Sequence, residues 1–191
     1  AKVVDKDVKL PEERQTSAET LEADTLEVLA DLNHASQKGL QTIFDSSVGR
    51  STVNHPLGGR YQITPTEASV QKLPVQHGVT TTASVMAQGF NPYVAEWSPY
   101  HGAAYAVIEA TARLVAAGAN WSKARFSYQE YFERMDKQAE RFGQPVSALL
   151  GSIEAQIQLG LPSIGGKDSM SGTFEELTVP PTLVAFGVTT A

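Results

Sequence analysis

Apolar and polar positions follow a helical period in some stretches of this chain and form strand-like runs in others. The clearest pattern predicts a helix from Pro99 to Ala117. Ser98 is a capping residue, Pro99 suits the first helical position, and Gly118 ends the pattern. The predicted apolar face comprises Ala104, Val107, Ile108, Leu114 and Val115. An alanine-rich helix of this kind is expected to be buried on a sheet.

Further helical patterns lie on both sides of this helix. A helix capped by Ser17 or Thr20 is predicted to run to about residue 33, and a short helix or turn is predicted over 36–44. A charged helix is predicted over 131–141. Pro145 is predicted to open another helix that Gly160 ends, with apolar residues at helical spacing: Val146, Leu149, Leu150, Ile153 and Ile157.

Runs of β-branched and small residues predict strands between these helices. One strand is predicted over 75–86, which is dominated by Val, Thr and Ala. A short strand is predicted over 124–128, and the last strand over 182–189. Residues 1–18 are predicted to be an arm or linker. Residues 45–73 are rich in Gly, Pro, Ser and Thr and are predicted to form a long loop, and such loops are often functional. The pattern predicts one α/β-type domain over residues 19–191.

Composition narrows the classes of function. The chain has 191 residues, 41% of them hydrophobic, which is enough for one core. Its net charge of −6 without a basic stripe argues against nucleic-acid or membrane partners. It contains no cysteine, which excludes disulfides and thiolate catalysis and fits a cytoplasmic location.

The segment from Gly165 to Gly172 carries the candidate chemistry, with the sequence Gly-Gly-Lys-Asp-Ser-Met-Ser-Gly. Backbone N–H groups in a glycine turn form a concavity that binds phosphate, and a lysine adds positive charge. An ordinary turn is the alternative. The spacing from Gly160 does not fit a Walker A loop, and Asp168 stands where that motif needs Ser or Thr. We expect the segment to form a loop at the edge of a sheet.

The chain resembles phosphoribosylformylglycinamidine synthase in its large form. The resemblance rests on the run from Leu161 to Ser171, on the Val-Thr-Thr-Thr-Ala-Ser run at 79–84, on Ala-Val-Ile-Glu-Ala at 106–110, and on the closing strand. These elements occur in the family's order over roughly residues 20–191. The chain looks like the domain that resembles the N-terminal domain of aminoimidazole ribonucleotide synthetase, taken from the second synthetase half.

This resemblance implies a fold and a reaction. The fold is a sheet of about four strands flanked by helices, and two such sheets pair into an eight-stranded barrel. The reaction converts formylglycinamide ribonucleotide, glutamine and ATP to formylglycinamidine ribonucleotide in purine biosynthesis. Glutamine hydrolysis in this family uses a cysteine, which this chain lacks. The implied partners are the other domains of the enzyme, including the first synthetase half and the glutaminase. Alone, the chain is expected to be inactive and to pair with a second copy over its open sheet face.

Site residues follow from the resemblance position by position. Lys167 is the predicted contact to the phosphate of ATP or ADP, in a cradle shaped by Gly165, Gly166, Ser169 and Ser171. Asp168 is predicted to orient Lys167, to bind metal, or to cap a turn. The family places a ligand-near loop over 45–65, where a substrate phosphate contact or an exposed loop charge is expected at Arg50, His55 and Arg60.

The family's second half can also hold a nucleotide with Mg²⁺. Glu109 matches an acidic ligand on the alanine-rich helix, and His77 stands where an aspartate is expected. Arg113 replaces an asparagine and is predicted to pair with Glu109 four residues earlier instead of admitting Mg²⁺. A scaffold half with a degenerate nucleotide site is therefore the alternative function. A thiamine-phosphate or selenide kinase of the same superfamily is a third, which the Gly-Lys-Asp-Ser-Met-Ser string argues against.

Overall fold

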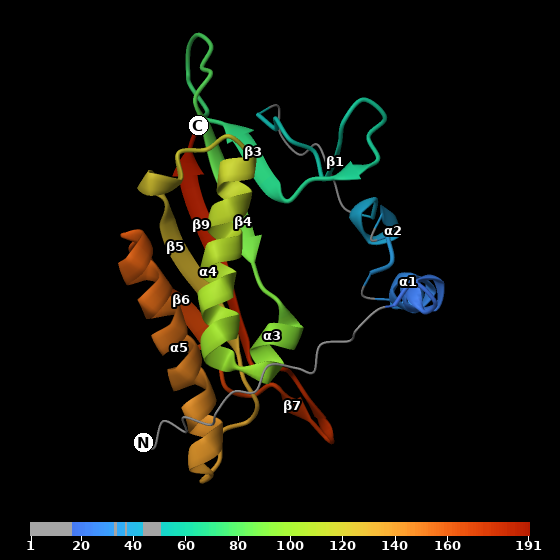
Figure 1. Ribbon diagram of the computed structural model, residues 1–191. Helices are drawn as coiled ribbons and strands as arrows, with labels where there is room; N and C mark the ends of the chain where they lie inside the picture. Colours follow the sequence, from blue (N-terminus) through green and yellow to red (C-terminus); the bar gives the residue numbers. More distant parts are fainter. Residues whose placement is uncertain (1–16, 33, 37, 44–50) are drawn as a thin grey trace.

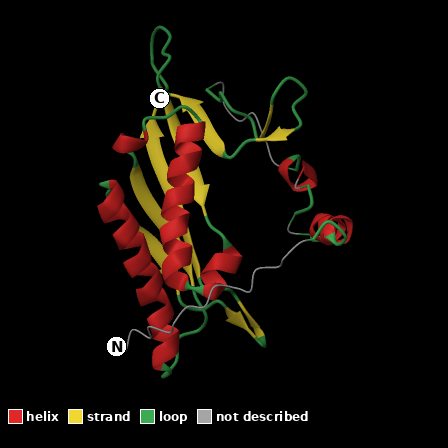
Figure 2. Cartoon of the chain, viewed as in Figure 1, coloured by secondary structure: helices red, strands yellow, loops and turns green. Residues whose placement is uncertain are grey.

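The computed structural model describes residues 17–32, 34–36, 38–43 and 51–191, and its centre is a five-stranded sheet with helices on one face (Figures 1 and 2). The strand order is β3-β4-β9-β5-β6. Only β5 and β6 are parallel neighbours. The strands are β3 (Ala68–Lys72), β4 (Ala83–Gly89), β9 (Thr182–Thr190), β5 (Arg125–Tyr131) and β6 (Ser163–Ser169). The expected sheet of about four strands thus has five, and the expected mixture of strands and helices is confirmed.

Side chains along the strands alternate between a buried face and an open face. The buried face carries the core, which includes Val85, Ala87, Phe126, Leu183 and Ala185. The open face carries Met86 and Val188, which are 44% and 41% exposed. Within the described residues, no helix covers this second face of the sheet (Figure 1).

Helix α4 (Pro99–Ala116) packs across the middle of the sheet, as the sequence predicts. The Ser98 hydroxyl accepts a hydrogen bond from the backbone N–H of His101, and Pro99 occupies the first turn. The buried side of α4 is made largely of small residues: Gly102, Ala103, Ala106, Val107, Ala110, Thr111 and Leu114. The preceding short helix, α3 (Pro92–Trp97), is capped by Asn91.

Helix α5 (Ala139–Leu159) packs beside α4, and its extent differs from the prediction. The charged helix predicted over 131–141 is wrong, because Tyr131 ends β5 and pairs with Thr182 of β9. Pro145 lies inside α5 and does not open it, while Gly160 ends it in the left-handed conformation, as predicted. The α5 residues buried against the domain are again small: Pro145, Ala148, Gly151, Ser152 and Ala155.

The strand predicted over 75–86 is also displaced. Residues 73–82 form the loop between β3 and β4, with Gly78 at a positive φ of 84°, and β4 continues to Gly89. The strand β3 falls inside the segment predicted to be a loop. It forms because Val70 pairs with Val85 and reaches the core, which a search for long apolar runs does not detect.

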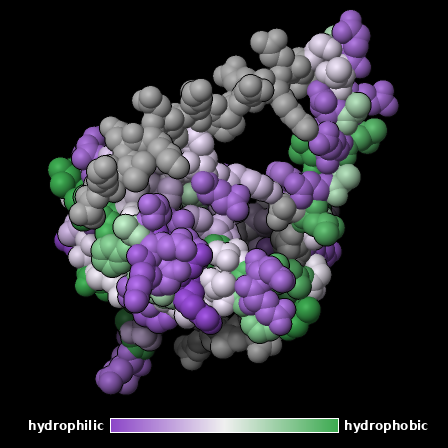
Figure 3. Space-filling view, turned by 90° about the horizontal axis from the view of Figure 1, so that it is seen from below, coloured by the Kyte–Doolittle hydropathy of each residue, from purple (hydrophilic) through white to green (hydrophobic). Residues whose placement is uncertain are grey.

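The smaller elements lie around this domain. Two short hairpins pair β1 (Leu57–Gly58) with β2 (Thr64–Pro65) and β7 (Thr173–Phe174) with β8 (Leu177–Thr178). Helices α1 (Leu21–Ala30) and α2 (Lys38–Gln41) lie apart from the sheet and bury no residue. Hydrophobic residues are visible on the surface at the left and at the right of the view in Figure 3. Within the described part of the chain, no helix combines the length and apolar character that crossing a bilayer requires.

The contact between α4 and α5 gives a direct test of the packing. A Cβ atom at Gly151 would overlap the backbone carbonyl of Tyr100, whereas a Cβ at Gly143, also in α5, would meet nothing within 4 Å. We expect Gly151→Ala to lower the free energy of unfolding by about 1–3 kcal/mol. Gly143→Ala should raise it by roughly 0.5–1 kcal/mol through helix propensity. Denaturant unfolding of both variants measures the difference, and equal effects would contradict the close helix contact.

Candidate functional site

Residues 165–169 of the predicted phosphate loop belong to the edge strand β6. The predicted loop is therefore wrong there, whereas its predicted place at the edge of a sheet is confirmed. Parallel pairing sets Gly166 beside Tyr128, Lys167 beside Gln129, and Asp168 beside Glu130. An extended strand points successive side chains to opposite faces. Lys167 therefore lies toward the open face of the sheet and Asp168 toward the helix-covered face. This separation argues against the alternative in which Asp168 orients Lys167.

The two glycines of β6 are required by the backbone of the strand. Gly165 has a φ of +132°, and a Cβ at Gly166 would approach the Tyr128 carbonyl oxygen to 2.7 Å. The first glycine permits an unusual backbone conformation, and the second permits close contact with β5. The two serines at the end of the strand are neighbours, with 3.4 Å between the Oγ atoms of Ser169 and Ser171.

Lys167 provides a positive charge beside a shallow hollow on the open face. Its Nζ lies 6.0 Å from the ring centroid of Tyr131, and its carbonyl accepts a hydrogen bond of 3.0 Å from Gln129 Nε2. Within the described residues it forms no ion pair. The hollow measures about 430 Å³, and its lining includes Ser127, Gln129, Ile164, Gly165 and Phe186. This arrangement is suited to holding one anionic group.

A buried carboxyl group lies on the other face of the same strand pair. Glu130 is 6% exposed, and burial, together with the nearby Asp168 carboxylate, raises its pKa to about 7. Burial and the Glu130 charge also raise the pKa of Tyr128, whose hydroxyl is buried without a hydrogen-bond partner among the described residues. The alternation along β5 turns both side chains toward the helix layer.

Arg113 forms the densest polar cluster among the described residues. Its Nη2 lies 2.9 Å from Glu109 Oε1, its Nε lies 3.1 Å from Glu67 Oε2, and its Nη1 donates to the Gln88 carbonyl at 2.7 Å. The predicted pairing of Arg113 with Glu109 is confirmed. The second Glu109 oxygen accepts the Phe90 backbone N–H at 2.8 Å, so both oxygens of this carboxylate are engaged.

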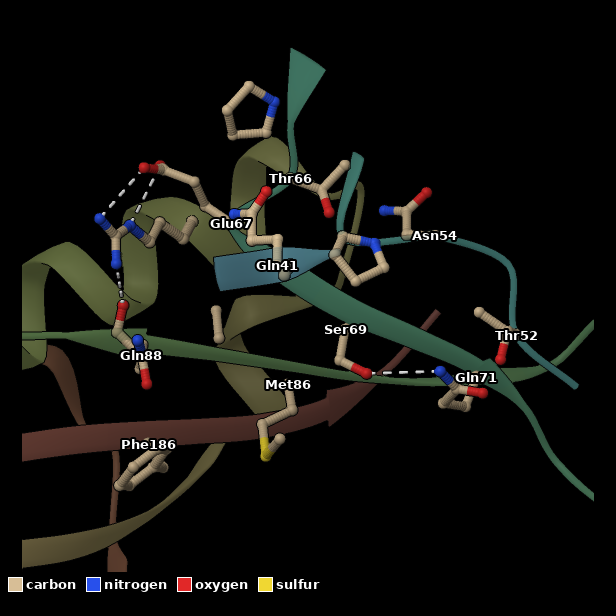
Figure 4. A pocket seen from close by; sticks show the side chains of 15 residues that line it. Gln41, Thr52, Asn54, Thr66, Glu67, Ser69, Gln71, Met86, Gln88 and Phe186 are labelled. Atoms are coloured by element: carbon tan, nitrogen blue, oxygen red, sulfur yellow. Dashed lines mark hydrogen bonds and ion pairs between the residues drawn. The ribbon is translucent and has the colours of Figure 1, made fainter. Parts of the chain in front are cut away.

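The Arg113 cluster borders a pocket of about 590 Å³. Glu67 and Gln88 lie on one side of this pocket (Figure 4). Ser69 and Gln71 line the β3 side, and their side chains are joined by a hydrogen bond of 3.5 Å. Gln41 of α2 reaches the pocket with its Oε1 buried and unpartnered among the described residues. The pocket is polar, and its one lining arginine is neutralised by two carboxylates.

The donor set at Glu109 does not fit Mg²⁺. An arginine between two carboxylates supplies the positive charge that a metal ion would otherwise bring, and it repels a second cation. Within the described residues no group of three or more acidic, histidine or cysteine side chains gathers as a metal site would require. His77 lies in the exposed loop between β3 and β4, whereas Glu109 lies in the middle of α4.

The remaining predicted residues do not join Lys167. His55 precedes β1, and Arg60 lies in the turn between β1 and β2, with its guanidinium 5.5 Å from the ring centroid of Tyr61. This hairpin lies near β3, at the opposite edge of the sheet from β6. Arg50 lies outside the described residues.

The sequence analysis did not predict two residues of these clusters, Glu67 and Glu130. Glu67 contacts Arg113 from 46 residues away, and no local pattern marks it. Glu130 carries a usable signal, since it continues the alternation of Phe126 and Tyr128 before Phe132 and is the one charged residue among these core-facing positions.

The sheet with helices on one face defines a mixed α/β domain, and comparison with solved structures identifies its fold as that of PurL synthetase domains. No protein-family model and no curated protein matches the chain. The PurLQS structure from Thermotoga maritima matches with a TM-score of 0.69 and 17% identity, over 96% of this chain and 26% of that one.

Two ligand complexes of the T. maritima protein show the same likeness. PurL complexed with AMPPCP matches with a TM-score of 0.66 and 18% identity, over 85% of this chain and 25% of that chain. PurL complexed with FGAR matches with a TM-score of 0.59 and 19% identity, over 75% of this chain and 21% of that chain. The chain thus spans about a quarter of the length of these neighbours.

The buried carboxyl group predicts a dependence of stability on pH. The folded state holds the Glu130 proton more tightly than the unfolded state, so its contribution to stability is full below the ordinary glutamate pKa of 4.5 and is lost as the pH rises through about 7. Glu130→Gln should therefore raise Tm by about 2–4 °C at pH 8 and change it little at pH 4. Thermal unfolding across this range, with the exposed Glu154→Gln as control, measures the effect. Parallel curves for wild type and Glu130→Gln would contradict it.

Proposed function

We propose that this chain is a synthetase domain of a larger, PurL-type ATP-dependent ligase. That ligase would convert formylglycinamide ribonucleotide, glutamine and ATP to formylglycinamidine ribonucleotide. Support comes from the shared fold and from neighbours that are PurL structures complexed with ATP, ADP and FGAR. Glutamine hydrolysis and the remaining domains would come from outside these 191 residues, which contain no cysteine.

Within that ligase, we propose, the domain acts as a scaffold half with a degenerate nucleotide site. The observation that carries this proposal is the Arg113 cluster. A magnesium–nucleotide complex needs free carboxylate oxygens, and Glu109 has both of its oxygens bound to Arg113 and Phe90. The Arg113 side chain is only 23% exposed, and its bidentate contact with Glu67 fixes it in place.

The open sheet face supports the scaffold role. Met86, Val188 and Phe186 lie on this face, and a sheet that keeps apolar side chains on its uncovered face is suited to pairing with a second sheet. The other synthetase half of the same ligase is the proposed partner, with the two sheets forming a closed barrel. Closing a barrel would also cover the edge strands β3 and β6.

The Lys167 hollow favours a second function, binding of a nucleotide phosphate. Lys167 has no acidic partner among the described residues, and the hollow beside it is open to the surface that would face a paired domain. A lysine in this position acts as a point charge toward an anionic oxygen. ATP or ADP would then bind through Lys167, at a site separate from the Arg113 cluster.

Calorimetric titration of the chain with Mg²⁺–ADP and Mg²⁺–ATP separates these two functions. The scaffold role alone predicts no binding at millimolar nucleotide for the wild type, because the Arg113 cluster leaves no carboxylate for the metal. Binding that Lys167→Ala weakens at least about tenfold would support the phosphate function at Lys167. Binding that Lys167→Ala leaves unchanged would contradict the scaffold role. Lys123→Ala, in the turn before β5, is the matched control for loss of one exposed lysine.

A further inference from the structure

Helix α5 carries a stripe of large apolar side chains on its outer side. Figure 1 places α5 at the left margin of the domain, and hydrophobic surface is visible on that side in Figure 3. Five members of this stripe have large exposed fractions: Phe142 59%, Leu149 41%, Leu150 43%, Ile153 47% and Ile157 71%. With Val146 included, helical steps of three or four residues connect the stripe from 142 to 157. Val146 lies between them and is half-buried.

This stripe is unusual because the buried side of α5 is made of small residues. Apolar periodicity normally marks the side of a helix that faces the core. Here the contact with α4 is made by small residues such as Ala148, Gly151 and Ala155, and the larger side chains point away from it. Contiguous apolar surface of this kind on a water-facing helix marks an interaction site.

The order of residues in the stripe is symmetric about its centre. An antiparallel pair of α5 helices centred between Leu149 and Leu150 brings these two residues together across the pair. The same register sets Val146 opposite the second copy's Ile153, and Phe142 opposite its Ile157. A two-fold interface requires such self-complementarity, since each contact occurs twice.

A hollow at the end of α5 fits the same register. It measures about 480 Å³ and is lined by Ile153, Gln156, Ile157, Gly160, Leu161, Pro162 and Ser163. Phe142 of a second copy would lie opposite Ile157 and so beside this hollow. An exposed aromatic ring that enters an apolar hollow is the typical anchor of a protein interface.

Charges beside the stripe permit this register. Glu154 would lie opposite Pro145, Glu140 opposite Leu159, and Arg141 opposite Gln158, so no two like charges meet. The five exposed side chains present on the order of 500 Å² per copy, and two copies together reach about 1,000 Å², the lower limit for a specific interface.

We propose that two copies of this chain associate through an antiparallel pair of α5 helices, centred between Leu149 and Leu150. The occupant of the stripe is thus a second copy of the chain. The inference does not rest on the proposed function, because α5 belongs to the helix layer and the proposed synthetase pairing uses the opposite, open face of the sheet.

Sedimentation equilibrium of the whole chain tests the association. The wild type should form a dimer at micromolar concentration, and Ile153→Glu should raise the dissociation constant at least about 100-fold. Ser147→Glu, outside the apolar stripe of the same helix, should leave it unchanged. A monomeric wild type at 200 μM, or a dimer that Ile153→Glu leaves intact, would overturn the proposal.

Cross-linking tests the register without placing a charge in the apolar stripe. Because the chain has no cysteine, Leu149→Cys introduces a single thiol directly beside the two-fold axis. A short bismaleimide should link two copies of this variant efficiently, and two copies of Ser147→Cys poorly. Equal linking of the two variants would overturn the register. A dimer dissociated by Met86→Lys and not by Ile153→Glu would place the association on the open sheet face and overturn the proposal.

Discussion

The close contact between α4 and α5 is the constraint on which the rest of the structure depends. It requires a glycine where α5 meets the Tyr100 carbonyl, and alanines along both helices. Because small residues make this contact, the large apolar side chains of α5 are left on its outer side. The two helices together occupy one face of the sheet, and the other face stays open. The open face of the sheet and the outer apolar stripe of α5, the two surfaces proposed for partners, therefore both follow from the way these helices pack.

The second organising feature is the Arg113 guanidinium, which lies between the carboxylates of Glu109 and Glu67. Arg113 joins α4 to the segment before β3 through Glu67 and to β4 through the Gln88 carbonyl. One side chain thus connects three elements beside the pocket of about 590 Å³. An internal guanidinium holds such elements without a metal ion, which favours a structural over a catalytic role for this corner of the domain.

Much of the fold could be predicted from local signals, and the site could be predicted only in part. Ser98 and Pro99 define the start of α4 because capping is a local interaction. The glycines of β6 suggested a loop, since sequence alone does not show that Gly166 fits against Tyr128 of a neighbouring strand. The Glu109–Arg113 pair follows from helical spacing, whereas Glu67 meets them only through the tertiary fold. Apolar spacing identified α5 as a helix and could not reveal that its stripe faces outward.

Titration with Mn²⁺, followed by electron paramagnetic resonance, tests most directly whether the Arg113 cluster leaves Glu109 unable to bind a divalent metal ion. Free Mn²⁺ gives a six-line signal that is lost on binding to protein oxygens. The account predicts that the wild-type chain leaves the free-ion signal unchanged at submillimolar Mn²⁺. Loss of the signal with one ion bound per chain, restored by Glu109→Gln, would contradict it.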